Sequence, residues 1–338
     1  MTPASWKGRC AYITGATGFV GTHLTRALVA RGARVVALVC ETAGHSPLFY
    51  QDLSDRVTLV RGDVEDSAAA EHVLREHAVD TVFHLAAQAL VGTAAVDPLR
   101  TFETNVRGAW CLLDACRRHG RTERIVLASS VQAAGGLSTL PTDDGQRAQK
   151  CHPYDVSKRC ADLIAAAYHD TYGLPIAITW CGNVYGPGDV NFSRIVPGTV
   201  RSALRGERPV IRSDGSPRRD YVHVAEVAEA YLLLAERLDG SQVRGRTFSF
   251  ATGELVSVLE LTKLILKAAG REDLQPILLN RPVRETAARQ GGGDLARRLL
   301  GWRPGRTTAA RMADTVAWYR EYFRNAPADR NPSARMEA

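Results

Sequence analysis

Residues 9 to 179 alternate short runs of β-branched and apolar residues with longer amphipathic segments. The short runs predict strands, and the segments between them carry apolar residues at helical spacing. Because a helix follows each strand, the connections are crossovers, which make the strands parallel and cover both faces of the sheet. We therefore predict an α/β fold built on a doubly wound parallel sheet. The expected strands are residues 9–14, 33–39, 56–60, 80–85, 124–129 and 175–179, and the expected helices are residues 19–31, 66–77, 98–119 and 154–172.

The pattern changes after residue 182, where turns rich in glycine and proline become frequent. We predict that residues 1–182 form the first domain, which the chain rejoins at about 220–250, and that residues 183–324 form a smaller α/β lobe. The polar tail 325–338 is expected to be disordered. Further helices are expected at residues 195–206, 224–238, 256–269 and 308–324.

Composition limits the function classes. No window holds the roughly 18 to 20 apolar residues of a membrane span, and residues 1–9 are too polar for a secretory signal. The seven cysteines form no CxxC pair and share no metal-like spacing with histidines, which predicts reduced thiols in a cytoplasm and no metal. The net charge is +7, but the aromatic content is only 7% and no dense Lys/Arg run is present, so nucleic acid is not predicted. Arginines gather between residues 194 and 219, either as a solvated helix face or as a phosphate site.

The segment "ITGATGFVG" places Gly15, Gly18 and Gly21 three residues apart, directly after the first strand and at the start of a helix. Glycines let the backbone turn tightly and approach a pyrophosphate, which then lies at the positive end of the helix dipole. This context predicts a dinucleotide-binding Rossmann sheet rather than a turn that serves only packing. The predicted cofactor loop also includes Thr17, Phe19 and Val20.

The end of the second strand indicates which dinucleotide binds. An acid there accepts hydrogen bonds from the adenosine ribose, whereas an arginine receives a 2′-phosphate. Val39 stands at the expected position of the acid and Glu41 follows two residues later, with no arginine, so NAD is favoured over NADP. Asp63 is predicted either to accept from the adenine amine or to cap the next helix. Glu41 and Val64 are predicted to contact the cofactor as well.

Tyr154 and Lys158 lie four residues apart in "HPYDVSKRCADLI", and hence on one face of a predicted helix. A phenol with a pKa of about 10 is a poor base at neutral pH, but a nearby ammonium favours its phenolate and can also hold the nicotinamide ribose. Ser130 ends the fifth strand, where its hydroxyl can donate to a substrate oxygen that becomes a carbonyl. We predict that these three residues are catalytic.

With these motifs, the chain resembles the extended short-chain dehydrogenase/reductases of the NDP-sugar epimerase/dehydratase branch over residues 8–322. The stretches "NFSRIVPGTVRSALRGERPVIRSDG" and "HPYDVSKRCADLI" are most similar to CDP-glucose 4,6-dehydratases. The motifs that carry the resemblance are "TGATGFVG", "HLAAQ" (84–88), "TFETNVRG" (101–108), "ASS", "YDVSK", "CGNVYGPGD" (181–189), "RDYVHV" (219–224) and "LLGWRP" (299–304).

The resemblance implies NAD as cofactor and a nucleotide-diphosphate sugar as substrate, with CDP or GDP favoured, bound partly by an arginine fork. It also implies a homodimer that pairs the helices at 98–119 and 154–172. The implied wall around the dinucleotide is Leu85, Ala86, Ala87, Gln88 and Asn105. The residues implied to contact substrate are Ser130, Val131, Gln132, Asn183, Arg194, Ile195, Val210, Arg212, Arg219 and Arg284.

One segment departs from the family pattern. The dehydratases carry an acid after the catalytic serine or threonine and then glutamate or lysine, and these two groups expel water from the sugar. This chain has Val131 and Gln132 there, followed by the small residues 133–136 ("AAGG"). Acid–base help is worth roughly 10² to 10⁴-fold per group, so elimination should fail. Trp180 is a second departure, because relatives often have arginine before the "CGN" segment.

We therefore predict an NAD-dependent nucleotide-sugar 4-epimerase, whose 4-keto intermediate turns in the site and is reduced on its other face. The small residues 133–136 would give space for that rotation and for a sugar with an extended C6 arm, unless their loop closes elsewhere. Two alternatives stay open. One is a 4,6-dehydratase whose acid and base come from other positions, and the other is a non-catalytic dinucleotide-binding sensor.

Overall fold

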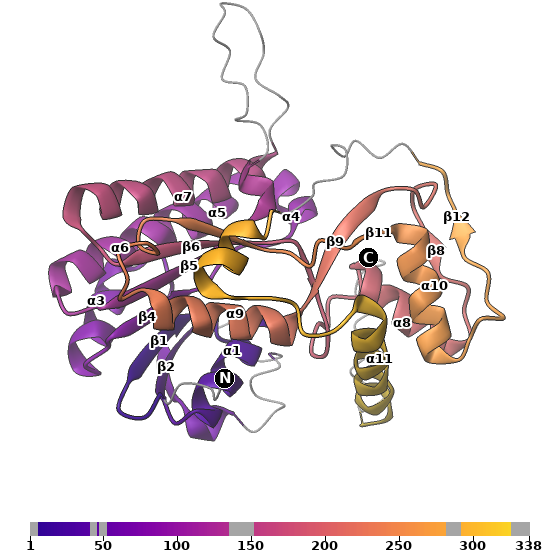
Figure 1. Ribbon diagram of the computed structural model, residues 1–338, viewed down its shortest axis with the longest axis horizontal. Coiled ribbons are helices and arrows are strands. Elements are labelled where there is room, and N and C mark those ends of the chain that lie inside the picture. The colour runs from indigo at the N-terminus through magenta and orange to yellow at the C-terminus, as the bar shows by residue number, and fades with distance from the viewer. Residues whose placement is uncertain (1–5, 41–45, 47–52, 135–151, 282–291, 326–338) are drawn as a thin grey trace, which may run out of the picture.

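A computed structural model describes residues 6–40, 46, 53–134, 152–281 and 292–325. The larger of its two lobes is built on a seven-stranded sheet in the order β10-β6-β5-β4-β1-β2-β3, with helices on both sides (Figure 1). Every neighbouring pair in this sheet is parallel, which confirms the predicted doubly wound fold. Its strands are β1 (Cys10–Thr14), β2 (Arg34–Val39), β3 (Thr58–Arg61), β4 (Thr81–His84), β5 (Arg124–Ser130), β6 (Ile176–Cys181) and β10 (Thr247–Phe250).

Both faces of this sheet are buried, and for this reason its central strands read as continuous apolar runs rather than alternating ones. All residues of β1 and β4 are buried. One face is covered by α1 and α9, and the other by α3, α6 and α7. These helices are α1 (Phe19–Ala30), α3 (Ser67–Glu76), α6 (Gly108–His119), α7 (Pro153–Tyr172) and α9 (Val224–Arg237).

The second lobe holds a three-stranded sheet, in the order β11-β9-β7, and a two-stranded sheet of β12 and β8. Its core lies between the three-stranded sheet and three helices, with Val200, Ile265, Met312 and Tyr319 fully buried. The elements are β7 (Asn183–Tyr185), α8 (Ile195–Arg205), β8 (Val210–Ile211), β9 (Arg218–His223), β11 (Leu255–Ser257), α10 (Val258–Ala269), β12 (Ile277–Leu278) and α11 (Thr308–Asn325).

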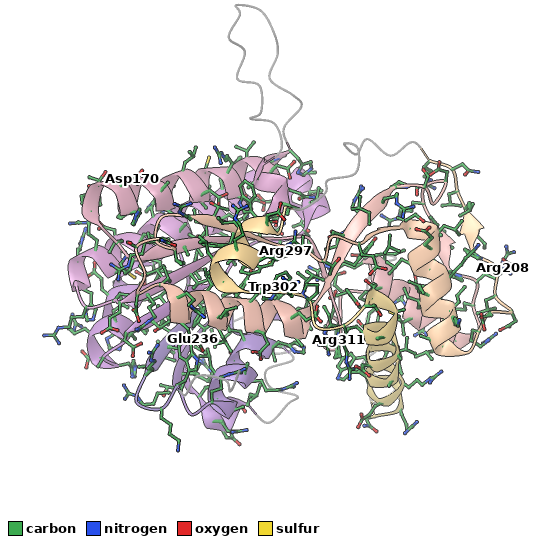
Figure 2. All side chains as sticks on the ribbon, viewed as in Figure 1. Asp170, Arg208, Glu236, Arg297, Trp302 and Arg311 are labelled. Carbon is green, nitrogen blue, oxygen red and sulfur yellow. The ribbon has the colours of Figure 1, made fainter. Side chains whose placement is uncertain are left out.

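The chain passes between the lobes repeatedly. After β9 it returns to the first lobe as α9 and β10, and after β12 it returns again as the short helix η5 (Ala296–Leu300). Trp302 follows η5 and packs edge-on against Phe250 at 5.1 Å between ring centroids. Figure 2 shows Arg297 and Trp302 over the large-sheet lobe and Arg311 at its junction with the second lobe. The domain boundaries set from the sequence stay a prediction.

The expected helices and strands agree with the structure to within two residues at each end, apart from one long helix. The predicted helix 98–119 is divided by a π-helical turn into α5 and α6. Asn325, where the tail was expected to begin, is the last residue of α11, and the remainder of the tail lies outside the described residues. None of the described helices is both long and apolar enough to cross a membrane. The remaining short elements are η2 (Ser54–Arg56), α4 (Val91–Val96), α5 (Pro98–Phe102), η3 (Glu103–Arg107) and η4 (Val131–Ala134).

Candidate functional site

The glycine turn after β1 packs directly against the segment that follows β4. Gly15 has φ +75°, and a Cβ there would lie 2.6 Å from the Ala86 nitrogen and 2.7 Å from the Leu85 carbonyl carbon. A Cβ on Gly21 would lie 2.0 Å from the Gly15 oxygen. Only glycine fits these positions, because β1 and β4 are neighbours and bring two turns together at one edge of the sheet. The predicted cofactor loop and part of the predicted dinucleotide wall are therefore one packed unit.

The start of α1 is open to an anion. Gly18 is its exposed N-cap residue, no side chain of the described structure caps it, and its first turn carries no acid. The first amides of a helix have no partner within the helix and carry the positive end of its dipole. A pyrophosphate can satisfy both, so the residues present fit the dinucleotide that the glycine motif predicts.

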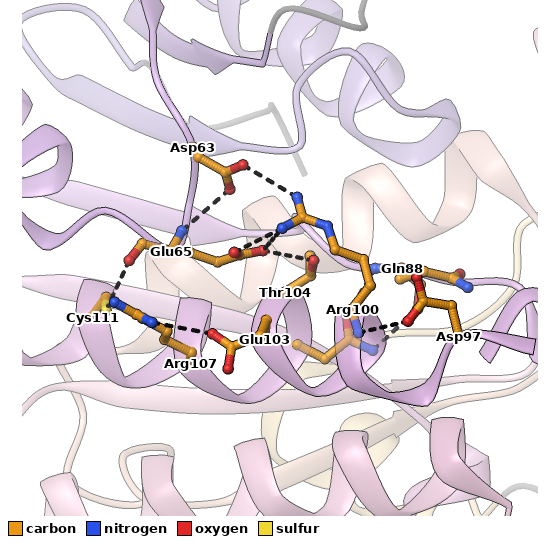
Figure 3. Close-up of polar contacts among 10 residues, drawn as sticks. Asp63, Glu65, Gln88, Asp97, Arg100, Glu103, Thr104, Arg107 and Cys111 are labelled. Carbon is orange, nitrogen blue, oxygen red and sulfur yellow. Dashed lines mark hydrogen bonds and ion pairs between the residues drawn. The ribbon is translucent and has the colours of Figure 1, made fainter.

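Asp63 lies in a polar cluster beside the expected adenosine region (Figure 3). Its Oδ2 accepts from Arg100 Nη2 at 3.2 Å, and Arg100 also pairs with Glu65 at 2.8 Å. Asp66, not Asp63, caps α3 by accepting from the Ala68 amide, so the capping alternative for Asp63 is wrong. Its contact with adenine stays a prediction, and Glu41 lies outside the described residues.

Ser130, Tyr154 and Lys158 meet where β5 ends and α7 begins. Ser130 is the last residue of β5, and its hydroxyl acts on the Tyr154 phenol and lowers the pKa of that group. His152 fixes the start of α7, because its side chain accepts from the Tyr154 amide. Lys158 Nζ, one turn further along, donates to the Ala128 carbonyl of β5 at 2.9 Å. The three predicted catalytic residues are thus brought together, all at least partly buried.

The charges around Tyr154 differ from the sequence-based expectation. Burial raises the pKa of Tyr154, while the Ser130 hydrogen bond and the charge of Arg194 lower it by less. The cation that acts on this phenol is Arg194, whereas we had expected Lys158 to do so. Burial also lowers the pKa of Lys158 to about 8. The described residues therefore leave the phenol protonated, and forming the phenolate requires additional positive charge.

Asn105 has a structural function that the sequence does not reveal. Its side chain accepts from the Gln88 amide at 2.7 Å and donates to the Gln88 carbonyl at 3.1 Å and to Ser157 Oγ at 2.9 Å. Ser157 in turn donates to the Tyr154 carbonyl at 2.8 Å. Asn105 thus ties the wall segment after β4 to the helix that carries the catalytic pair. Ser157 was missed, since one serine on a helix gives no sequence signal.

The segment after Ser130 contains no ionisable side chain at its first positions. It forms η4, and the Gln132 amide donates to Ser130 Oγ at 3.2 Å. Ala133 is fully buried, so it is packed against protein and cannot provide the free space that we expected from it. Residues 135 and 136, which share that expectation, lie outside the described residues.

A family model described as "NAD dependent epimerase/dehydratase family" matches residues 11–249. The chain belongs to this family. Its cofactor is NAD, and the enzymes of this family modify nucleotide sugars, as predicted.

Three similar proteins represent three different reactions. A dTDP-4-dehydro-6-deoxy-D-allose reductase from Streptomyces sp is 32% identical, over 96% of this chain and 100% of the relative. The crystal structure of a UDP-glucose 4-epimerase from Thermotoga maritima with UDP-glucose has a TM-score of 0.82 at 26% identity and covers 93% of this chain and 99% of that one. A dTDP-glucose 4,6-dehydratase from Streptomyces venezuelae with NAD and TYD bound has a TM-score of 0.78 at 29% identity, covering 92% and 97%.

Of the predicted substrate residues of this epimerase/dehydratase chain, residues 130–132 lie in β5 and η4, and the described residues beyond 182 lie on several elements of the second lobe. Arg194 is the N-cap residue of α8 and pairs with buried Asp189 at 3.1 Å. Arg212 is exposed directly after β8, and Arg219 lies in β9. Arg284 lies outside the described residues. The remaining positions are Asn183 in β7, Ile195 in α8 and Val210 in β8.

Proposed function

We propose that this protein is a nucleotide-sugar 4-epimerase, which oxidises and reduces C4 without expelling water. One observation carries the proposal. Ser130, Tyr154 and Lys158 are assembled at the end of β5, while the next two positions, in η4, are Val131 and Gln132. Neither side chain can protonate a leaving hydroxyl or remove a carbon-bound proton, and losing both groups would cost elimination roughly 10⁴-fold or more.

The described residues supply what a C4 oxidation needs from the protein. The Tyr154 phenol exchanges a proton with the sugar O4, and the Ser130 hydroxyl donates to that oxygen when it becomes a carbonyl. The Lys158 ammonium holds the nicotinamide ribose, and the charge of Arg194 acts on the phenol. NAD, when bound, supplies the hydride acceptor and donor. Epimerisation then requires that the 4-keto sugar present its other face before reduction.

A 4-keto-sugar reductase is the second candidate. The relative that carries this name is 32% identical and covered in full. A reductase uses the same three side chains in one direction only, with Tyr154 giving its proton to O4 as the hydride arrives. A reductase does not need the sugar to rotate. Because buried Ala133 provides no free space for such a rotation, its position favours a reductase over an epimerase.

The two candidates and the dehydratase alternative differ in stoichiometry. The purified protein is incubated in deuterated water with UDP-, dTDP-, CDP- and GDP-sugars and, separately, with a 4-keto nucleotide sugar and NADH. The products are examined by mass spectrometry and NMR. A 4-epimerase gives a C4 epimer without net use of NADH and without carbon-bound solvent deuterium in the sugar. Stoichiometric loss of NADH with a 4-keto sugar indicates the reductase. Loss of water together with deuterium at C5 contradicts the proposal and supports the dehydratase.

The proposal also concerns which nucleoside diphosphate the sugar carries. The sequence resemblance favours CDP or GDP, whereas the relatives named above carry dTDP or UDP in their names. The arginines of the second lobe suit the diphosphate that all four nucleotides share. Competition by the four free nucleoside diphosphates against a bound nucleotide sugar would rank the bases. If the protein binds NADH but no nucleotide sugar, the non-catalytic sensor becomes the better description.

We also propose that the protein is a homodimer formed through α5, α6 and α7, which pack side by side (Figure 1). Large apolar side chains on these helices are exposed, namely Leu99 (70%), Trp110 (45%) and Leu163 (53%). Exposed large apolar side chains on one layer of helices favour an interface there if they form a continuous patch. Light scattering after size exclusion should give twice the chain mass, and Leu163→Glu should give the monomer. A wild-type monomer at micromolar concentration would contradict the proposal.

A further inference from the structure

A third ionisable residue continues the line of the catalytic pair along α7. Tyr154, Lys158 and Asp162 follow one another at intervals of four residues, so their side chains lie on one helix face. All three are buried, and Asp162 is only 3% exposed. A buried carboxylate is unusual unless it is paired and hydrogen-bonded. The function described above gives Asp162 no part.

The surroundings of Asp162 leave it incompletely satisfied. Trp180 Nε1 donates to Asp162 Oδ2 at 2.9 Å. Its other oxygen, Oδ1, and the Ser129 hydroxyl are both buried and have no well-aligned hydrogen-bond partner in the described structure. Ser129 and Trp180 are register partners on β5 and β6, so both neighbours of the carboxylate come from the strands beneath α7. Trp180 is a neutral donor, so the charges that compensate Asp162 are those of Lys158 and Arg159.

Lys158 is likewise a buried charged group with few hydrogen-bond partners. Its ammonium donates to a single described acceptor, the Ala128 carbonyl, and is almost fully buried. His84 of β4 also feels the Lys158 charge, and its Nδ1 is hydrogen-bonded to Thr14 Oγ1 at 2.8 Å. Burial lowers the pKa of His84 to about 3, so His84 is neutral and contributes no charge. Asp162 is the carboxylate whose charge reaches Lys158.

We propose that Asp162 is a positioning residue for Lys158, whose carboxylate keeps the buried ammonium charged and available to the nicotinamide ribose. The proposal rests on the cofactor-binding role given to Lys158 above. Trp180 orients the carboxylate, because its indole N–H donates to one of the two carboxylate oxygens.

The titration behaviour of the group agrees with this geometry. Burial lowers the pKa of Lys158 to about 8, and the charge of Asp162 opposes that decrease. Burial raises the pKa of Asp162, while Ser129, Trp180 and the charges of Lys158 and Arg159 lower it. Without the carboxylate, Lys158 loses its proton at a lower pH. The pH above which NADH binding is lost should therefore decrease toward neutral pH, because binding needs the charged ammonium of Lys158.

The test is the pH dependence of NADH binding, measured by fluorescence between about pH 6 and 10 for the wild type and Asp162→Asn. We expect the alkaline midpoint to fall by about one pH unit, since the variant removes the opposite charge that raises the pKa of Lys158. Asp162→Glu should restore it. Asp170→Asn is the matched control, because Asp170 lies exposed on the same helix (Figure 2). A folded Asp162→Asn protein with the wild-type midpoint would overturn the proposal.

A second variant keeps the proposal testable if Asp162→Asn does not fold. An unpaired buried ammonium would then be the cause, so Lys158→Met combined with Asp162→Asn should recover the thermal stability that the single change loses. If the double variant stays unfolded, Asp162 acts independently of Lys158 and the proposal fails. NADH binding is read without any sugar, so inactivity toward every nucleotide sugar would count against the 4-epimerase and leave this result unaffected.

Discussion

Replacing Gly15 by alanine should destabilise the protein far more than the same change at Gly8. Both residues have a positive φ, +75° and +81°, so an L side chain is strained equally at the two positions. That strain is worth about 1–2 kcal/mol. At Gly8 nothing lies within 4 Å of the added Cβ, whereas at Gly15 it meets backbone atoms of residues 85 and 86 at 2.6 to 2.9 Å. Backbone cannot move aside as a flexible side chain can, so overpacking adds about 1–3 kcal/mol.

The assay is urea unfolding of the two variants beside the wild type, with the free energy of unfolding compared at one temperature. We expect a loss of about 1–2 kcal/mol for Gly8→Ala and about 2–5 kcal/mol for Gly15→Ala. The Gly15 variant should also bind NADH more weakly, because the displaced turn no longer presents the start of α1. Equal losses for the two variants would refute the reasoning, since they would show that backbone strain alone accounts for the effect.

Three further predictions follow from the described contacts. Tyr154→Phe should lower kcat by roughly 10²–10⁴-fold and leave NADH affinity nearly unchanged, which steady-state kinetics and fluorescence titration can check together. Glu226→Gln should cost about 3 kcal/mol in urea unfolding, because buried Glu226 Oε1 accepts from the amides of Gly305 and Arg306 and from Arg311; an unchanged midpoint would show that these contacts are dispensable. Burial raises the pKa of Asp189, so its folded state binds a proton more tightly, and this contribution to stability is lost as pH rises through the raised value. The stability of Asp189→Asn relative to wild type should therefore increase with pH, and a flat difference curve would contradict the prediction.

The sequence predicts the local parts of this fold well. Strands buried on both faces need continuous apolar runs, and amphipathic helices between them need helical spacing, so both leave a clear pattern. The glycine turn was also predictable, since a tight approach of backbone to backbone admits no side chain. The position of β10 beside β6 was not predictable, because the pairing joins residues about 70 positions apart. The sequence "TFSF" does not indicate which strand it pairs with.

In the candidate site, too, the sequence predicts local features but not contacts between distant segments. The spacing of Tyr154 and Lys158 predicts a shared helix face, and the end of β5 places Ser130 beside them. The charges were less predictable: Arg194 acts on Tyr154 from another lobe, and Asp162 meets Trp180 from a neighbouring strand. Such contacts depend on how separate elements pack, and sequence spacing carries no information about them.

The repeated return of the chain to the large sheet has a practical consequence for protein engineering. β10 forms an edge of that sheet, and Trp302, which lies beyond η5, packs on Phe250 within β10. A chimera that exchanged everything after β6 would therefore also replace strand β10 and the Trp302 side chain that covers it. Both belong to the large-sheet lobe, which the exchange was meant to leave intact. To change substrate preference while keeping the large-sheet lobe intact, several separate segments must be exchanged. Each exchanged segment must end where the chain re-enters the large-sheet lobe.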